Sequence, residues 1–408
     1  MSLRVLLATL RRHSLMPLLV FLQVALACAI LSNVLFLSWQ QLEPMLAPSG
    51  VDAANLVIVD RLGAGDRTWT SAEVHAGVQA LREVPGVRAA SAAESLPMVS
   101  TSIYAYGVQG PSKIKIGVNV YAGEGLVNTL GVQLPSGRDF LADEYREEGG
   151  YKGAPEPVIV TQALAYKLFG RTPALGQRVA DPENPAAAGY RVVGIVRHLL
   201  RNQLGMATDG RADDTMLIPQ RIGDTAMPLY AVRVDPRMRE AALHGVRKAI
   251  QHQFGAELPA GTQPRVSFYR TRRSDAFKDR RAALWLFAGV VSTVVVVTVI
   301  GIMGLTGFWV QKRTRQIGIR RALGARRSDI LCYFLTENAL IVGAGAVLGM
   351  AMAYLGNAWL MRYYELQHLP WPFLPYGALL MLLLGQLAVL SPALRAARVP
   401  PVVATRSV

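Results

Sequence analysis

Residues 312–327 read KRTRQIGIRRALGARR, and this basic stretch decides how the rest of the chain is folded. Seven of its residues are Lys or Arg and none is acidic, while apolar runs flank it at 282–310 and 330–361. A helix that spans a bilayer needs about 20 apolar residues, and both runs are longer than that. The stretch is therefore a short loop between two membrane spans, and its positive charge places it in the cytoplasm.

Two further apolar runs, at 15–39 and 373–394, complete a prediction of four spans. Around the second span the positive-inside rule hardly favours either orientation, because six basic residues precede the span and seven follow it. The six are Arg270, Arg272, Arg273, Lys278, Arg280 and Arg281. The first span decides the orientation, since Arg11 and Arg12 precede it and residues 40–43 after it carry no positive charge. Both termini are then cytoplasmic. The expected cytoplasmic segments are 1–14, 311–329 and 395–408, and the expected exterior segments are 40–281 and 362–372.

The net charge of +15 is concentrated in these short cytoplasmic segments. It therefore reports membrane topology, and we expect no nucleic-acid partner. The positive start and first apolar run also have features of a signal peptide, and Ala25-Leu26-Ala27-Cys28 is similar to a lipoprotein cleavage box. Cleavage would leave a mature chain that begins with apolar residues, so we expect an uncleaved anchor.

The exterior segment 40–281 is predicted to be an α+β domain with two lobes, one inserted in the other. Its first strand, helix and second strand, at 55–59, 70–84 and 87–91, form a β-α-β start, with Thr70 or Ser71 capping the helix. Further strands are expected at 113–121, 157–160, 190–196, 216–219 and 229–234, and helices at 162–169 and 237–254. The domain has no cysteine, because Cys28 and Cys332 lie in or beside spans, so it must be held by an ordinary core.

The basic stretch has two interpretations. Charge alone would suffice for a stop-transfer segment held by anionic lipid headgroups. However, Ile319 and Leu323 are four residues apart, so a helix here would carry a small apolar face, and Gly324-Ala325 would end it. A solvent loop has no use for such a face, whereas a helix that docks on a partner does.

Other motifs within the spans are ambiguous. Glu337 and Asn338 lie inside the third span, where an ionisable group is a functional candidate; the alternative is that Glu337 lies at the cytoplasmic interface. Gly345, Gly349 and Ala353 provide small residues every four positions, which suits close helix packing within the chain or across a dimer.

We find no catalytic constellation. The sequence contains no G-x-x-x-x-G-K-[ST] loop for a triphosphate, no H-E-x-x-H and no G-x-S-x-G. We therefore expect a chain that is not an enzyme and that itself holds no cofactor and no metal.

The segment Arg313–Ala325, RTRQIGIRRALGA, closely resembles the signature of the FtsX/MacB-type ABC transporter permeases, also called type VII or mechanotransmission permeases. Residues 392–401 resemble their terminal motif, so the permease domain would cover 282–401. The exterior segment resembles the MacB-like periplasmic core in pieces that occur in the right order: 137–140, 168–170, 175–176 and 190–196. Gln316 departs from the family, which usually has Glu there, so a role for a carboxylate at this position is in doubt.

The resemblance implies a dimeric permease, identical or paralogous in its second copy, in the bacterial inner membrane. A separate ATPase, which binds ATP and Mg, would dock on Arg315, Ile317, Gly318, Ile319, Arg320, Arg321, Ala322, Leu323, Gly324 and Ala325. Its action would move the exterior domains and drive efflux of a compound or peptide, with a periplasmic adaptor and an outer-membrane duct as further partners beside membrane lipid. The alternatives are lipoprotein release and regulation of a cell-wall enzyme.

Overall fold

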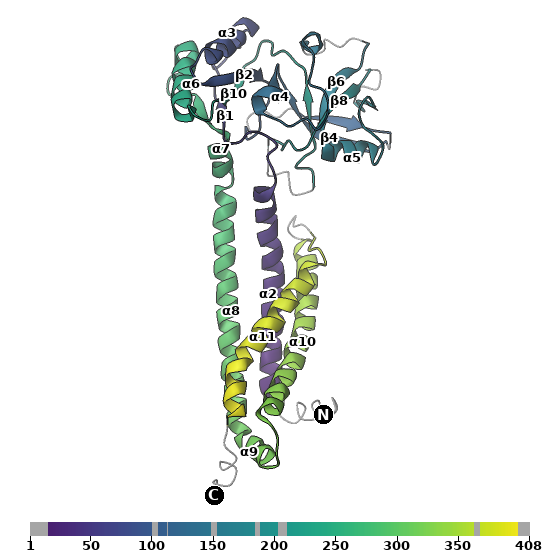
Figure 1. Cartoon of the computed structure of the whole chain (residues 1–408), viewed down its shortest axis with the longest axis vertical. Coiled ribbons are helices and arrows are strands. Elements are labelled where there is room, and N and C mark those ends of the chain that lie inside the picture. The colour runs from purple at the N-terminus through teal and green to yellow at the C-terminus, as the bar shows by residue number, and fades with distance from the viewer. Residues whose placement is uncertain are drawn as a thin grey trace. The chain divides into compact units, whose positions relative to one another are not determined.

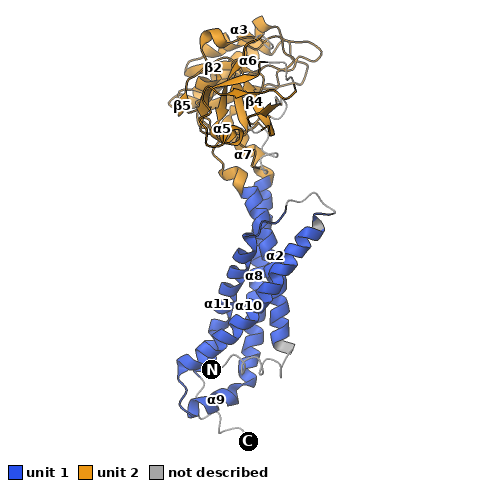
Figure 2. Ribbon diagram, turned by 90° about the vertical axis from the view of Figure 1, so that its right-hand side faces the viewer, with its two compact units in different colours: residues 1–42, 280–408 blue, residues 43–279 orange. Residues whose placement is uncertain are grey.

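The computed structural model describes residues 15–99, 105–111, 113–147, 153–183, 188–202, 210–362 and 368–398. The chain divides into two compact units, residues 1–42 with 280–408 and residues 43–279 (Figure 2). The first contains the helical bundle and the second contains the β-sheets (Figure 1).

Four helices of the first unit are long and apolar enough to cross a membrane. They are α2 (Leu15–Leu46), α8 (Lys278–Lys312), α10 (Arg327–Leu360) and α11 (Phe373–Ala397). Helix α2 continues seven residues past the predicted span end at 39. The extension contains Gln40, Gln41 and Glu43, which are polar but favour helix, so hydropathy alone missed it.

Small residues bring α10 against α2. A Cβ on Gly345 would lie 2.9 Å from the carbonyl oxygen of Phe21, and one on Gly349 would lie 2.6 Å from that of Ala25. Ala353 is buried in a cluster that includes Phe36. The structure thus places all three predicted packing residues against α2 of the same chain, which is one of the two interpretations that the sequence left open.

The second unit contains a four-stranded sheet in the order β11 (Arg265–Phe268), β1 (Leu56–Asp60), β10 (Leu229–Val234) and β2 (Val87–Ala93). Strand β10 lies between β1 and β2 and is antiparallel to both. The predicted β-α-β start, with α3 (Ser71–Arg82) as its helix, is therefore present in the chain, but its two strands are not neighbours.

A mixed seven-stranded sheet follows the order β3-β4-β9-β6-β8-β5, and β7 pairs with β8. Its strands are β3 (Ala105–Gln109), β4 (Lys115–Ala122), β5 (Ser136–Gly137), β6 (Glu156–Thr161), β7 (Arg178–Val179), β8 (Tyr190–Val196) and β9 (Thr215–Ile218). All of them fall between β2 and β10 in the chain. The unit is nevertheless one compact body, so a division into two lobes stays a prediction.

Three apolar cores fill the spaces between the two sheets and the helices that cover them. Helices α3 and α6 (Arg239–Phe254) cover one face of the four-stranded sheet, and its other face shares a core with α4 (Leu126–Leu130) and the seven-stranded sheet. Helix α5 (Gln162–Phe169) covers the far face of the larger sheet (Figure 1). A short 3-10 helix (Ala142–Glu144) and α7 (Tyr269–Ala276) complete the unit. Strands β3, β5, β7 and β11 and helices α4 and α7 were not predicted.

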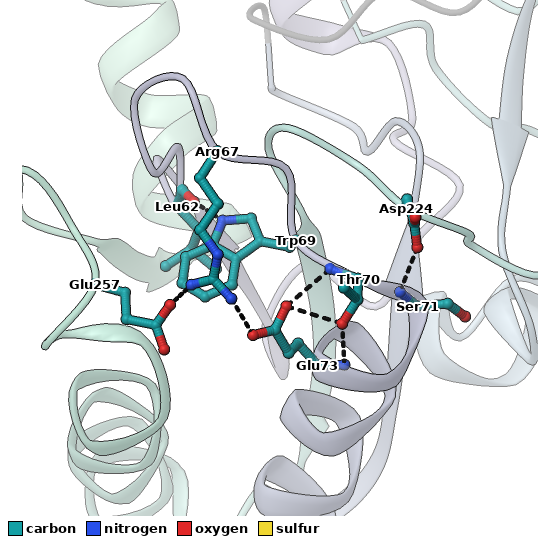
Figure 3. A network of polar contacts seen from close by, with 8 residues as sticks. All are labelled: Leu62, Arg67, Trp69, Thr70, Ser71, Glu73, Asp224 and Glu257. Carbon is teal, nitrogen blue, oxygen red and sulfur yellow. Dashed lines mark hydrogen bonds and ion pairs between the residues drawn. The ribbon is translucent and has the colours of Figure 1, made fainter.

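Polar contacts fix the start of α3 (Figure 3). Thr70 is the N-cap, and Glu73 accepts from its backbone N–H at 2.8 Å, which completes a capping box. These hydrogen bonds and the nearby Arg67 lower the pKa of Glu73. Arg67 also pairs with Glu257 and lies over the Trp69 ring, whose Nε1 donates to the Leu62 carbonyl at 2.6 Å. The loop before α3 is thereby held to the end of α6.

Glu156, at the start of β6, has a carboxyl whose contribution to the free energy of unfolding should depend on pH. Burial raises the pKa of its carboxyl to about 7 from an ordinary value near 4.5. A raised pKa means that the folded state holds the proton more tightly, so, as far as Glu156 is concerned, the free energy of unfolding is highest below about pH 4.5 and falls as the pH rises through 7. We expect Glu156→Gln to raise it by at most about 3 kcal/mol at pH 8 and to leave it unchanged at pH 4.5.

The measurement is urea unfolding of the two sheets by circular dichroism in the purified chain at both pH values. Glu83→Gln, at an exposed position, is the control. An equal response of the two variants would show that burial of Glu156 costs no stability.

Candidate functional site

The predicted docking segment forms a separate helix, α9 (Thr314–Ala322), between α8 and α10. It ends in a hydrogen-bond pattern that suits glycine. Gly324 has a φ of 96°, its N–H donates to the Arg321 carbonyl, and the N–H of Ala325 donates to the Arg320 carbonyl, both at 3.1 Å. This is a Schellman motif, in which the left-handed residue is most often glycine. The position of Gly324 therefore sets where the helix stops.

The two faces of α9 differ. Ile317 and Gly318 are buried, and Ile317 belongs to the core of the bundle. On the outer side, Ile319 is 47% exposed and Leu323 is 83% exposed. Of the other predicted docking residues, four are exposed and two are half-buried: Arg315, Arg320, Ala322 and Gly324, then Arg321 and Ala325. One face anchors the helix while the other presents apolar side chains outward.

A buried ion pair attaches the start of α9 to α10. Arg313, the residue between α8 and α9, donates through Nη1 to both carboxylate oxygens of Glu337, at 3.2 and 3.3 Å. The same nitrogen lies 3.3 Å from the Tyr333 hydroxyl, and the guanidinium stacks 4.3 Å from the Trp309 ring centroid. Glu337 is thus placed inside the bundle with a partner, as a buried charge requires.

Asn338 has a different partner. Its Nδ2 donates to the Gly385 carbonyl of α11 at 3.0 Å. Because an amide that bonds a carbonyl on another helix contributes to helix association, its place here is explained by packing of α10 against α11. The Arg321 guanidinium donates to the Ala397 carbonyl at 3.4 Å, which ties α9 to the end of the same helix.

A groove of about 570 Å³ lies between α9 and the first turns of α10. Leu323 and Gln316 line it, as does Arg320, whose guanidinium lies 5.0 Å from the Tyr333 ring centroid. Within the part of the chain that the structure describes, no group of His, Cys, Asp or Glu side chains could hold a metal ion.

Sequence reasoning identified Ile319, Leu323 and Gly324 but missed Arg313 as the partner of Glu337. Both are charges at the edge of, or inside, apolar runs, and that shared feature was the available signal. The two lie far apart in sequence, so only the fold reveals that they pair.

Two families match the sequence. The MacB-like periplasmic core domain matches residues 24–252, and the FtsX-like permease C-terminal domain matches residues 288–401. With four helices suited to spanning a bilayer, these matches make the chain a multi-pass membrane protein.

Among curated relatives, the macrolide export ATP-binding/permease protein MacB of Nitrobacter winogradskyi is 26% identical over 362 residues, which cover 85% of this chain and 51% of that protein. MacB of Bdellovibrio bacteriovorus is 29% identical over 205 residues, which cover 48% of this chain and 30% of that protein. The chain therefore spans about half, or less, of the length of these two relatives.

The uncharacterized ABC transporter permease YknZ of Bacillus subtilis is 25% identical over 300 residues, 69% of this chain and 68% of that protein. Among solved structures, the periplasmic region of MacB from Actinobacillus actinomycetemcomitans aligns with a TM-score of 0.37 at 12% identity, over 56% of this chain and 95% of that one.

Proposed function

Since this chain belongs to the family of ABC transporter permeases that join an FtsX-like permease domain to a MacB-like periplasmic core domain, we propose that it is a membrane subunit that couples a separate ATPase to movement of the exterior sheets. In this proposal both termini are cytoplasmic, the membrane is the bacterial inner membrane, and a second permease, identical or paralogous, completes the transporter. The work done is export of a compound or peptide, assisted by an adaptor and an outer-membrane duct.

One observation carries the proposal: α9 presents Leu323, 83% exposed, from a helix whose other face is fixed in the bundle. An exposed leucine at the end of a basic helix gains about 1.5–3 kcal/mol when a partner covers it. A segment that served only as a lipid anchor would need the arginines and not the leucine. The buried pair of Arg313 and Glu337 supports the same conclusion, because a helix that transmits force must be held to the spans it moves.

The test is reconstitution of the chain in nanodiscs, alone and with a cognate ABC ATPase. We expect no ATP hydrolysis by the chain alone, because its sequence has no phosphate-binding loop, and sustained hydrolysis by the complex. A partner ATPase with its phosphate-loop lysine replaced by Ala is the control for contaminating activity. Hydrolysis by the pure chain, or failure of any cognate ATPase to bind it, would contradict the proposal.

A further inference from the structure

The basic residues of α7 and of the first turn of α8 are unusual on the exterior side of a span, where positive charge is normally scarce. The structure gives three of them internal partners. Arg272, Arg273 and Arg280 all donate hydrogen bonds to backbone carbonyls of other elements. These side chains therefore take part in hydrogen bonds within the fold, and two of them, Arg273 and Arg280, reach the end of α2.

The C-terminal end of α2 needs outside donors. Pro44 lies inside the helix and has no N–H, so the carbonyl of Gln40 cannot receive the bond that position 44 supplies in an ordinary helix. The last carbonyls of any helix also lack intrahelical donors. In addition, α2 has no basic residue in its last turn to complement its dipole.

Two arginines from the α7–α8 segment supply those donors. Arg280 Nη1 donates to the Gln40 carbonyl at 3.2 Å and to Gln41 Oε1 at 3.4 Å. Arg273 Nη2 donates to the Met45 carbonyl at 3.2 Å and to the Ala47 carbonyl at 2.5 Å. The arginines are seven residues apart, which is about two helical turns, and the carbonyls they reach lie in the last two turns of α2 and at Ala47, the residue after it.

Arg272 fixes α7 to the four-stranded sheet. Its buried Nη2 donates to Asp60 Oδ1 at 2.7 Å and to the Ile58 carbonyl at 3.0 Å, both on β1. Its Nε also donates to Ser267 Oγ of β11 at 2.9 Å. The helix that carries Arg273 is thus held on the sheet by the residue immediately before it.

We propose that Arg280 and Arg273 are positioning residues that fasten α2 to the α7–α8 segment through carbonyls at the end of α2, one of them freed by Pro44. The exposed Trp39 and Trp285, which are next to Gln40 and five residues after Arg280, suit the membrane interface. The fastening thus lies at the two places along the chain, near residues 42 and 280, where the helical bundle is joined to the unit that contains the sheets. Its consequence, that the two connections move together, rests on the proposed function.

A double-mutant cycle tests the fastening without reference to transport. Nitroxide labels are placed at Trp39 and Ala282 in a Cys28→Ala, Cys332→Ser background, and the labelled chain is diluted with unlabelled chain. Electron–electron resonance then gives the distance distribution between α2 and α8. We expect Arg280→Ala to increase the separated population about tenfold, because a hydrogen bond from a charged donor is lost.

In the Pro44→Ala background the residue at 44 donates to the Gln40 carbonyl, so Arg280→Ala should change the population less than threefold. Lys278→Ala removes an exposed cation two residues away and should leave the distribution unchanged. Arg280→Gln replaces the alanine variant if the latter does not accumulate. An unchanged distribution in both Arg280 variants, or an equal effect with and without Pro44, would overturn the fastening.

Transport per ATP hydrolysed, measured in the reconstituted complex, tests the consequence. We expect it to fall about tenfold for Arg280→Ala while ATP hydrolysis continues, and to be unchanged for Lys278→Ala. If the distance cycle holds but transport per ATP is unchanged, the two connections need not move together. If no cognate ATPase or transport is found at all, the proposed function fails, and the distance cycle still decides the fastening.

Discussion

Leu323→Asp is expected to abolish binding of the ATPase, or transport where binding survives, while the chain still inserts in the membrane. Leu323 is 83% exposed at the end of α9, so the substitution leaves the isolated chain unstrained. In the complex, however, it would place an unpaired carboxylate in an apolar contact, at a cost of about 3 kcal/mol or more, which is about 100-fold or more in affinity. The measurement is co-purification of the ATPase at matched expression, together with a transport assay.

Two variants control for this result. Leu141→Asp makes the same change at another exposed leucine, in the unit that contains the sheets, and should bind the ATPase as the parent chain does. Arg326→Ala removes an exposed charge beside α9 and should cost about 0–1 kcal/mol. Wild-type binding and transport by Leu323→Asp would mean that residues 312–327 only anchor the chain in the membrane.

Glu337→Ala is expected to destabilise the helical bundle and to release α9 from α10. The substitution leaves the buried Arg313 guanidinium without its carboxylate, and loss of one partner of a buried pair costs about 3–5 kcal/mol. We expect a lower thermal unfolding temperature in detergent and faster trypsin cleavage at the arginines of α9, with weaker ATPase binding as the result. Thr336→Ala, at the exposed neighbouring position, is the control.

The double variant Arg313→Met, Glu337→Leu tests whether the bundle needs the two charges or only the volume that the two side chains fill. Replacement of a buried ion pair by apolar residues of similar volume is often neutral for stability, so this variant should recover much of what Glu337→Ala loses. If Glu337→Ala unfolds and is cleaved as the parent chain is, the pair does not hold α9 in place.

Segments with strong local signals were predictable from sequence. The predicted strands Tyr190–Val196 and Leu229–Val234 have these same bounds in the structure, because alternating or continuous β-branched residues specify them locally. Strand β11 and helix α7 were missed. Their segment, Arg265–Ala276, is rich in arginine, and its burial depends on partners such as Asp60 that lie far away in the chain.

In the candidate site, too, features with a local signal were predictable and contacts between distant residues were not. The apolar spacing of Ile319 and Leu323 and the stop at Gly324 are local features, and they predicted a short helix with an exposed apolar face, which α9 has. Whether Glu337 lies deep in the bilayer or at its interface stays a prediction, and its partner Arg313 is one that no local pattern could identify. Likewise, the use of Gly345 and Gly349 against α2 follows from helix arrangement rather than from their spacing.

The position of β10 between β1 and β2 has a consequence for biosynthesis. Strand β1 is buried along its whole length, yet both of its neighbours, β10 and β11, are made only after the entire larger sheet. Until the ribosome reaches Leu229, β1 and β2 therefore have unpaired edges and uncovered apolar faces, which are the features that promote aggregation. Pairings so distant in sequence also slow folding. The nascent chain consequently has a long interval in which we expect a holding chaperone to raise the yield, and we expect truncations just before β10 to leave it permanently in that state.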